Sequence, residues 1–397
     1  MNSARLLCKL IHLLCYSQYG WSFFAGKKTG SRQTYRSARV RECELLLDRL
    51  RELVDRPIRI MVACGIQNRV IMQNRLRERL PKGLTLVAGP GCSACVVPAG
   101  YIDVFVRIAV LPDVITASCK DVLSVPGSRE SLASVAARGA HIVEITTPND
   151  CLALAKANPG KIVVYPAVGF EASAPSVAET ILEAAEQGID NFCVIPSIRL
   201  LPPTIDQILR DPCLNIHGLL CSDHLSSISD TEAYTRLARK YSIACCVTGF
   251  ELFDILRGLL SMVIQIRRGE ASYDDQTAEY FSSEESERIR QMVSEVFFVA
   301  DTLWRGLGII SGSGFIIRDE LALYDATKRF HIRFSEEDLL RSCACDKIIS
   351  GKALPPDCPS FGMACTPEDP IGPCMITNEG ICWSYFHFSN VGETEAL

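Results

Sequence analysis

The chain has 397 residues, of which 48% are hydrophobic and 22% are charged, a composition typical of globular proteins. A chain of this length usually forms more than one domain, because single hydrophobic cores stop growing at about 250–300 residues. Residues 1–41 contain eight Lys or Arg and no Asp or Glu, whereas the rest of the chain contains 33 basic and 46 acidic side chains. An acidic body argues against nucleic acid as a partner.

The basic leader, residues 1–40, admits two interpretations. Its apolar run from Leu6 to Cys15 is interrupted by Lys9 and is shorter than the roughly 20 apolar residues that cross a bilayer. A basic, acid-free leader that contains serine also fits an organelle transit peptide. We interpret it as a disordered extension or a misassigned start, because such a segment buries too little apolar surface to become ordered. Since no other run is long enough to span a membrane, we expect a cytoplasmic protein without membrane contact.

From residue 41 onward, helical patterns alternate with short apolar runs. Apolar residues at helical spacing predict helices over Arg41–Asp55, Ser176–Gln187, Thr231–Tyr241 and Ser283–Leu303. Continuous apolar runs predict strands at Ile58–Cys64, Leu84–Ala88, Val114–Ala117, His141–Ile145, Lys161–Ala167, Phe192–Ile195, Gly218–Cys221 and Ser242–Val247. Runs without alternation are typical of parallel strands that helices cover on both faces. The sequence therefore predicts an α/β fold with two doubly wound parallel-sheet domains of similar topology.

Two copies of the tripeptide Gly-Phe-Glu, at Gly169–Glu171 and Gly249–Glu251, each follow a predicted strand. They would mark equivalent strand ends in two related domains, unless the repeat is a coincidence. The expected division of the chain is a first α/β domain over 41–128, a second over 129–247, a helical return to the first domain over 248–335 and a Cys-rich module over 336–397.

The C-terminal module carries six of the nineteen cysteines, at positions 343, 345, 358, 365, 374 and 382, where Pro and Gly are dense. A secreted disulfide framework is typical of short chains without a core and does not suit this one. Irregular turns let thiolates converge on a metal cluster and leave backbone N–H groups free to bond sulfur. The spacing Cys343-x14-Cys358-x6-Cys365-x16-Cys382 has no close pair of the kind that structural zinc sites use. It favours a [4Fe–4S] cluster, with four zinc thiolates as the alternative.

A C-x-x-C motif, Cys92 to Cys95, follows the strand Leu84–Ala88 and is flanked by glycines. Two thiols at this spacing can form a disulfide reversibly. The alternative is a pair of buried cysteines in a turn. Cys64 ends the preceding strand, and the carboxyl ends of parallel strands lie at one edge of a sheet. We therefore expect Cys64 and Cys92 to meet over one crevice, which would suit a soft metal or an Fe(II) fragment.

Candidate acid–base groups are few. Glu171 and Glu251 follow strands, His224 lies just past another strand, and Asp121 and Glu379 lie in loops. Taken singly, each is more often a solvated charge or a helix cap than a catalyst. The P-loop, GxGxxG and serine-elbow motifs are missing from the sequence, which argues against nucleotide hydrolases, dehydrogenases and serine hydrolases.

Over roughly residues 56–388 the chain resembles the hydrogenase maturation factor HypD family. The resemblance rests on ordered motifs: Cys64-Gly65, Gly89-Pro90-Gly91-Cys92-x-x-Cys95, Val125–Ser128, both Gly-Phe-Glu tripeptides, Trp304–Gly308, Cys358–Gly362, Cys365–Glu368 and Glu379-Gly380. The spacing of Cys343, Cys358, Cys365 and Cys382 matches the family's cluster ligands.

The resemblance implies two α/β domains of similar topology and a [4Fe–4S] domain. It also implies a HypC-like chaperone and a HypE-like cyanide donor as partners. Cys64 would ligate a transient Fe(II) while cyanide and carbonyl ligands are added for [NiFe]-hydrogenase. Cys92 and Cys95 would be a redox dithiol. The cluster would pass electrons to that dithiol or to the iron site, and Glu171, His224 and Glu379 would be catalytic residues beside Cys64, Cys92 and Cys95.

The chain departs from the family pattern beside these cysteines. Gln67 replaces a histidine, Lys120 and Asp223 replace glycines, and Ser173 replaces a threonine. Because polar neighbours orient metal ligands and tune their chemistry, these changes leave two alternatives open. One is a divergent paralogue that serves another metal-delivery pathway. The other is a non-catalytic binding module with a structural cluster.

Overall fold

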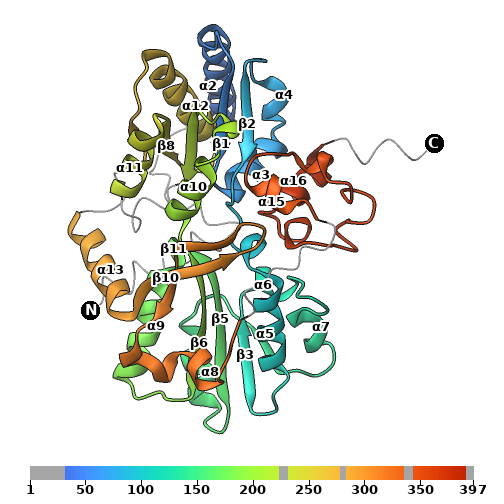
Figure 1. The fold of residues 1–397 in the computed structure, drawn as a ribbon, viewed down its shortest axis with the longest axis vertical. Coiled ribbons are helices and arrows are strands. Elements are labelled where there is room, and N and C mark those ends of the chain that lie inside the picture. Colours follow the sequence, from blue (N-terminus) through green and yellow to red (C-terminus); the bar gives the residue numbers. More distant parts are fainter. Residues whose placement is uncertain (1–31, 223–230, 278–282, 335–342, 390–397) are drawn as a thin grey trace.

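A computed structural model describes residues 32–222, 231–277, 283–334 and 343–389, and two β-sheets form its framework (Figure 1). The first sheet has the order β2-β1-β7-β8-β9 and is parallel throughout. Its strands are β1 (Ile58–Val62), β2 (Leu84–Ala88), β7 (Gly218–Ser222), β8 (Ala244–Thr248) and β9 (Tyr273–Asp275). The second sheet has the order β10-β11-β6-β5-β3-β4. Its strands are β3 (Val114–Ser118), β4 (Ile142–Glu144), β5 (Ile162–Phe170), β6 (Phe192–Arg199), β10 (Phe297–Trp304) and β11 (Gly308–Ile317).

All eight predicted strands are present, and the predicted α/β class is confirmed. Strands β3 to β6 are parallel, whereas β10 and β11 form an antiparallel hairpin at one edge of the second sheet. The parallel strands follow the same order in both sheets, β2-β1-β7-β8 and β4-β3-β5-β6. In each sheet the order reverses beside its first strand, which is where open α/β sheets form a crevice.

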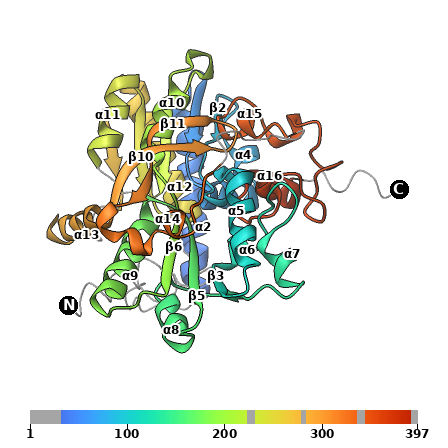
Figure 2. The same cartoon turned by 60° about the horizontal axis from the view of Figure 1, so that its bottom comes forward.

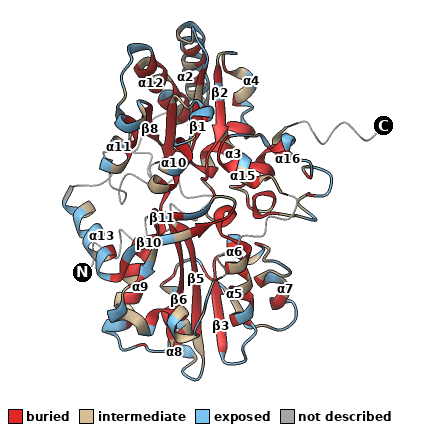
Figure 3. Ribbon diagram, in the orientation of Figure 1, coloured by how far each residue is buried: buried red, intermediate tan, exposed pale blue. Residues whose placement is uncertain are grey.

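Helices cover both faces of both sheets, which explains the continuous apolar runs. Neighbouring residues Ile60 and Met61 are both fully buried, but they pack in different cores on opposite faces of β1. Figure 3 shows the inner parallel strands as buried almost throughout, whereas the hairpin β10–β11 is partly exposed. The helices are α2 (Arg32–Leu53), α3 (Gly65–Gln73), α4 (Leu76–Arg79), α5 (Ala99–Ala109), α6 (Lys120–Leu123), α7 (Leu132–Ala136), α8 (Asp150–Ala157), α9 (Ala174–Glu186), α10 (Leu201–Leu209), α11 (Thr231–Tyr241), α12 (Leu252–Arg268), α13 (Ser283–Val296), α14 (Ala326–Arg329), α15 (Cys345–Ile349) and α16 (Ile381–Phe388).

The sheets do not follow the residue ranges expected for the domains. Strand β3 lies within 41–128 but belongs to the second sheet, and β7 and β8 lie within 129–247 but belong to the first. The range 248–335 adds β9 to the first sheet and the hairpin β10–β11 to the second. The chain therefore crosses between the sheets several times. These crossings could not be predicted from the sequence, because all these strands have a similar apolar composition.

The helix predicted over Ser283–Leu303 is wrong in its last third. Helix α13 ends at Val296, and Phe297–Trp304 is strand β10. This stretch begins with two phenylalanines and a valine, residue types that favour strands, and it pairs with β11 through the turn at Gly306 and Gly308. The two Gly-Phe-Glu copies do not mark equivalent strand ends. Gly169 and Phe170 are the last two residues of β5, the third parallel strand of its sheet, whereas the second copy follows β8, the fourth parallel strand of the other sheet.

Residues 343–389, hereafter the Cys-rich segment, consist of α15, α16 and irregular turns. Figures 1 and 2 show the segment beside α3 and α4, on the side opposite α11 and α13. Its apolar residues, among them Met375 and Tyr385, share one buried core with Ile102 and Phe105 of α5. The Cys-rich segment is therefore part of the folded core and packs against α5. No helix among the described residues is long and apolar enough to span a membrane.

Candidate functional site

A cavity of about 100 Å³ lies where the carboxyl ends of strands from the two sheets face each other. Residues at or just after the carboxyl ends of β1, β2, β3, β5, β6 and β7 line it, together with residues 377–379 of the Cys-rich segment. Its lining side chains include Cys64, Cys92, Asp121, Ser173, Ser222, Thr377 and Glu379. Because β1 and β3 are the strands at which the two sheets reverse their order, the cavity lies at the crevice that this topology creates.

Cys64 lies between β1 and the first turn of α3 and is 7% exposed. Burial raises the pKa of its thiol to about 12, although hydrogen bonds from the Gln67 backbone N–H and the Ser222 hydroxyl favour the thiolate. At neutral pH the free thiol is therefore protonated, and a metal that binds it must displace the proton.

Glu379 reaches the same cavity from the Cys-rich segment. Burial, and then the nearby charge of Asp121, raise its pKa to about 7, while Arg69 opposes the shift. A carboxyl that titrates near neutral pH can accept the proton of the neighbouring thiol once a bound metal has lowered the pKa of that thiol.

Cys92 and Cys95 form a disulfide with their Cα atoms 5.2 Å apart. The Thr377 hydroxyl oxygen lies 3.2 Å from each sulfur, and the Cys95 N–H donates to Cys92 Sγ. Cys92 lines the cavity, whereas Cys95 is not among its lining residues. Cys92 is therefore the sulfur that a group in the cavity would meet.

Two glycines explain how three segments come this close. A Cβ on Gly91 would lie 2.2 Å from the Ala63 carbonyl oxygen, and a Cβ on Gly65 would lie 2.5 Å from the Glu379 carbonyl oxygen. The Gly65 N–H also donates to the Gly91 carbonyl at 2.9 Å. Glycine at both places is thus a packing requirement for bringing Cys64 against the Cys92 turn and the Cys-rich segment.

Gln67 does not line the cavity. It is fully buried in α3, and its Nε2 lies 3.0 Å from both the Cys221 carbonyl and Thr248 Oγ1, and 3.2 Å from the Gly249 carbonyl. The side chain therefore ties the Cys64 loop to the ends of β7 and β8. This geometry favours an orienting role over proton transfer.

We expect Gln67→Leu to lower the free energy of unfolding by about 1–3 kcal/mol, because buried acceptors would lose their donor. Urea denaturation of the full chain measures this loss. Gln73→Leu, an exposed glutamine of the same helix, is the matched control and should be nearly neutral. Equal stability of both variants would show that the contacts of Gln67 contribute nothing.

The structure does not bring Glu171 into the cavity, although Phe170, Ala172 and Ser173 line it. Glu171 Oε1 accepts a 2.6 Å hydrogen bond from the Leu201 N–H at the start of α10, and burial raises the pKa of its carboxyl to about 8. The carboxyl therefore holds α10 in place. His224 and Asp223 lie outside the described residues. Lys120 begins α6 next to Asp121.

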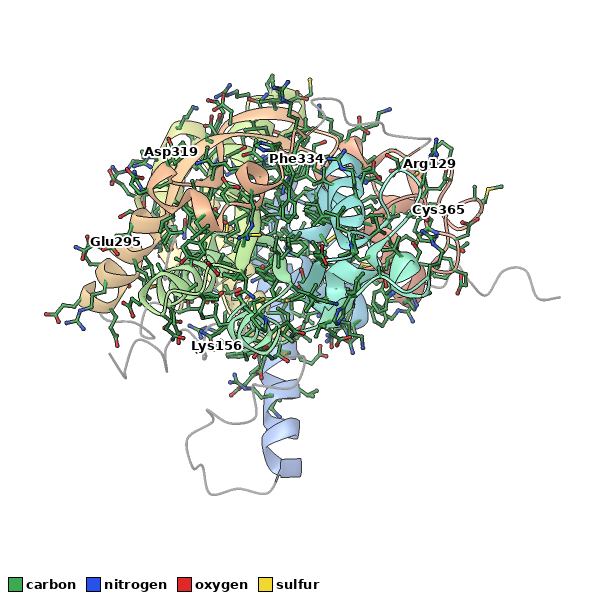
Figure 4. The ribbon with its side chains drawn as sticks, turned by 90° about the horizontal axis from the view of Figure 1, so that it is seen from below. Arg129, Lys156, Glu295, Asp319, Phe334 and Cys365 are labelled. Atoms are coloured by element: carbon green, nitrogen blue, oxygen red, sulfur yellow. A yellow bond between two sulfur atoms is a disulfide. The ribbon has the colours of Figure 1, made fainter. Side chains whose placement is uncertain are left out.

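Several cysteines of the Cys-rich segment lie close to one another. Cys374 Sγ lies 3.5 Å from Cys382 Sγ and within hydrogen-bonding reach of Cys343. Cys365 Sγ accepts a 3.3 Å hydrogen bond from the Ile371 N–H, and Cys358 is buried in the same core. Figure 4 labels Cys365 among the turns of this segment. Cys374, which the spacing argument left out of the ligand set, thus lies among the other thiols.

Arg305 lies next to these thiols and is only 4% exposed. Its Nε and Nη1 have no hydrogen-bond partner among the described residues. The pKa of Cys343 is lowered by hydrogen bonds from Cys345 and Cys374 and further by the charge of Arg305. Within the described part of the chain, no three His, Cys, Asp or Glu side chains are placed to hold a single metal ion. Buried thiols, an N–H bond to sulfur and a buried guanidinium with two unpaired nitrogens fit a larger anionic group with sulfur acceptors, such as an iron–sulfur cluster.

Sequence reasoning gave no role to Thr377, Ser222 or Arg305. Thr377 and Ser222 stand in no motif of their own. Arg305 stands in the Trp304–Gly308 motif, but nothing in that motif relates it to cysteines that follow about 40 residues later.

The similarity of this chain to known proteins spans the residues that form the cavity and those of the Cys-rich segment. The family model described as "HypD: Hydrogenase formation hypA family" matches residues 41–389. The chain belongs to the HypD family. Hydrogenase maturation factor HypD2 of Bradyrhizobium diazoefficiens is 35% identical, over 84% of this chain and 90% of the relative. HypD of Rhodobacter capsulatus is 32% identical (89% and 95%), and HypD of Escherichia coli is also 32% identical (86% and 94%). The HypD match includes every candidate site residue and leaves out the basic leader, residues 1–40.

Proposed function

We propose that this chain is a scaffold and redox relay for metallocofactor assembly. It holds iron on Cys64 while cyanide and carbonyl ligands are added, and so helps to build the Fe(CN)2CO group of [NiFe]-hydrogenase. One observation carries the proposal: Cys64, the Cys92–Cys95 disulfide and the Cys-rich segment meet at one cavity.

The size of the cavity suits this cargo. A volume of about 100 Å³ is well below the roughly 300–1,000 Å³ of pockets that hold drug-sized ligands. That space suits an iron ion with a few diatomic ligands better than a nucleotide or a peptide. Iron binding displaces the thiol proton of Cys64, and the Glu379 carboxylate is placed to accept it.

The relay joins the Cys-rich segment to the disulfide. A [4Fe–4S] cluster on Cys343, Cys358, Cys365 and Cys382 would supply single electrons, drawn from a low-potential electron-transfer protein. Reduction of the Cys92–Cys95 disulfide takes two such electrons and two protons, breaks the S–S bond and leaves two thiols. Thr377 supports this route, because its hydroxyl lies 3.2 Å from both sulfurs and belongs to the loop between Cys374 and Cys382.

The partners would be a HypC-type chaperone that shares the iron and a HypE-type protein that donates cyanide. Free thiols and Fe(II) persist in reducing compartments, which supports a cytoplasmic location.

A divergent paralogue for another metal-delivery pathway is the competing proposal. Of the departures from the family pattern, Ser173 lines the cavity, as do Ser93 and Ala94 between the two cysteines of the disulfide, and these changes favour an altered cargo. Gln67 does not face the cavity, so its replacement of histidine does not add to that argument.

The test is complementation of a bacterium that lacks its own HypD, together with a pull-down of the HypC-type partner. We expect the wild-type chain to restore [NiFe]-hydrogenase activity and to copurify with iron that shows cyanide and carbonyl stretching bands. A cluster-bearing protein that neither complements nor binds the chaperone would favour the paralogue instead.

The disulfide makes a separate prediction. Under mild thiol redox buffers, Cys92 and Cys95 should convert between disulfide and free thiols, as alkylation and mass spectrometry would record. Cys213, which is exposed, should react throughout, and fully buried Cys151 should stay unlabelled. If Cys92 and Cys95 never react in the native protein, the relay is refuted and the cluster is structural.

A further inference from the structure

Arg305 connects the disulfide turn to the Cys-rich segment. It lies in the turn between β10 and β11, and its backbone N–H donates to the Val96 carbonyl at 2.8 Å. Val96 directly follows Cys95. On its other side, a Cβ on Gly306 would lie 3.0 Å from Asp346, so the turn packs against the start of α15. The backbone of Arg305 therefore fixes the two cysteine sites relative to each other.

The guanidinium points to the cysteine side of this junction. Its Nη2 lies 3.9 Å from the place where a Cβ on Gly372 would stand, and Cys343 Sγ lies 3.5 Å from that same place. Two nitrogens of this guanidinium, Nε and Nη1, are buried and have no hydrogen-bond partner among the described residues. A buried cation with unpaired N–H groups requires an anionic neighbour.

We propose that Arg305 is a positioning residue that supplies the compensating positive charge for the cluster and thereby raises its reduction potential. The inference rests on the proposed cluster. Four thiolates give a [4Fe–4S] centre a net negative charge, and reduction adds one electron to it. A fixed cation nearby stabilises the reduced form more than the oxidised form. Net charge and hydrogen bonds to sulfur are among the main determinants of cluster potentials.

The test is a redox titration of anaerobically prepared full-length protein, followed by electron paramagnetic resonance, with dithionite as reductant. Arg305→Gln removes the charge, and Arg305→Lys keeps it on a side chain with different geometry. We expect Arg305→Gln to lower the equilibrium constant for one-electron reduction about tenfold, which corresponds to about 59 mV. Arg305→Lys should remain closer to the wild type.

Arg59→Gln is the matched control. Arg59 also holds the Cys-rich segment, by donating from Nη2 to the Gly351 carbonyl, but no contact between its side chain and a cysteine is recorded. Arg59→Gln weakens this contact with the Cys-rich segment but leaves the positive charge of Arg305 beside Cys343. The reduction potential of the cluster should therefore stay at the wild-type value.

The outcomes separate this inference from the proposed function. Wild-type protein without iron and sulfide would refute the cluster and the inference with it. A wild-type cluster whose potential is unchanged in Arg305→Gln would overturn the inference alone. Equal shifts in Arg305→Lys and Arg305→Gln, or in Arg59→Gln, would assign the effect to packing and overturn it too. If Arg305→Gln loses the cluster, the Arg305→Lys variant decides. A cluster retained at the wild-type potential in Arg305→Lys supports the need for a positive charge, and a shifted potential in Arg305→Lys contradicts it.

Discussion

Cys64→Ser is expected to abolish hydrogenase maturation and to leave the rest of the molecule intact. Serine keeps the size of the side chain, but its hydroxyl is a far poorer ligand than thiolate for the iron cargo. The iron and sulfide of the Cys-rich segment and the exchange of Cys92 with Cys95 should remain at wild-type levels. Complementation of a strain without HypD measures the loss, and metal analysis with alkylation measures what is retained.

Cys119→Ser is the matched control for this variant. Cys119 also follows the carboxyl end of a strand, β3, but its sulfur lies 3.8 Å from the Tyr165 hydroxyl and does not line the cavity. We expect Cys119→Ser to keep maturation activity. Full activity in Cys64→Ser would mean that the iron is held elsewhere and would refute the assignment of the cavity.

Cys358→Ser is expected to remove the cluster. Anaerobic wild-type protein should be brown and contain about four irons and four sulfides per chain, and the variant should be bleached, because a cubane needs all four thiolates. Visible absorption and iron and sulfide analysis measure this. We expect Cys374→Ser to keep the cluster, since the spacing that matches the family uses Cys343, Cys358, Cys365 and Cys382.

The position of Cys374 makes that comparison decisive. Its sulfur lies 3.5 Å from Cys382 and within hydrogen-bonding reach of Cys343, so proximity alone would include it in the ligand set. Bleaching in Cys374→Ser with a retained cluster in Cys358→Ser would assign the ligands by proximity instead of spacing. Stoichiometric zinc without sulfide in the wild type would exclude an iron–sulfur cluster altogether.

The predictable part of the fold came from local patterns. Buried parallel strands are apolar on both sides, so Ile58–Val62 and seven further strands could be recognised from their residues alone. The position of Cys64 and Cys92 after successive strands likewise placed them at one sheet edge, and both line the cavity. The prediction of a helix beyond Val296 was wrong. The residues from Phe297 onward continue a helical pattern in the sequence, but they form strand β10 because they pair with β11.

The role of a polar side chain could not be predicted in the same way. Glu171 follows a strand as a catalytic carboxylate would, yet its carboxyl accepts a hydrogen bond from Leu201 and does not reach the cavity. Gln67 stands in place of a histidine beside Cys64, but the ends of β7 and β8 determine where its amide points. The direction in which a polar side chain points depends on packing partners that are distant in the sequence.

The sequence by itself determined the α/β class, the strands and the cysteines with their spacing, because periodicity and residue type act over a few positions. Only the tertiary structure decided which sheet each strand joins, and that Thr377, Glu379 and Arg305 meet the cysteines. Those contacts bring together residues about 40 to 300 positions apart, and no local pattern records which distant backbone will approach. Gly65 and Gly91 illustrate the physical reason. A side chain at either position would collide with the backbone of another segment that packs against it, so the need for glycine arises only from the tertiary structure.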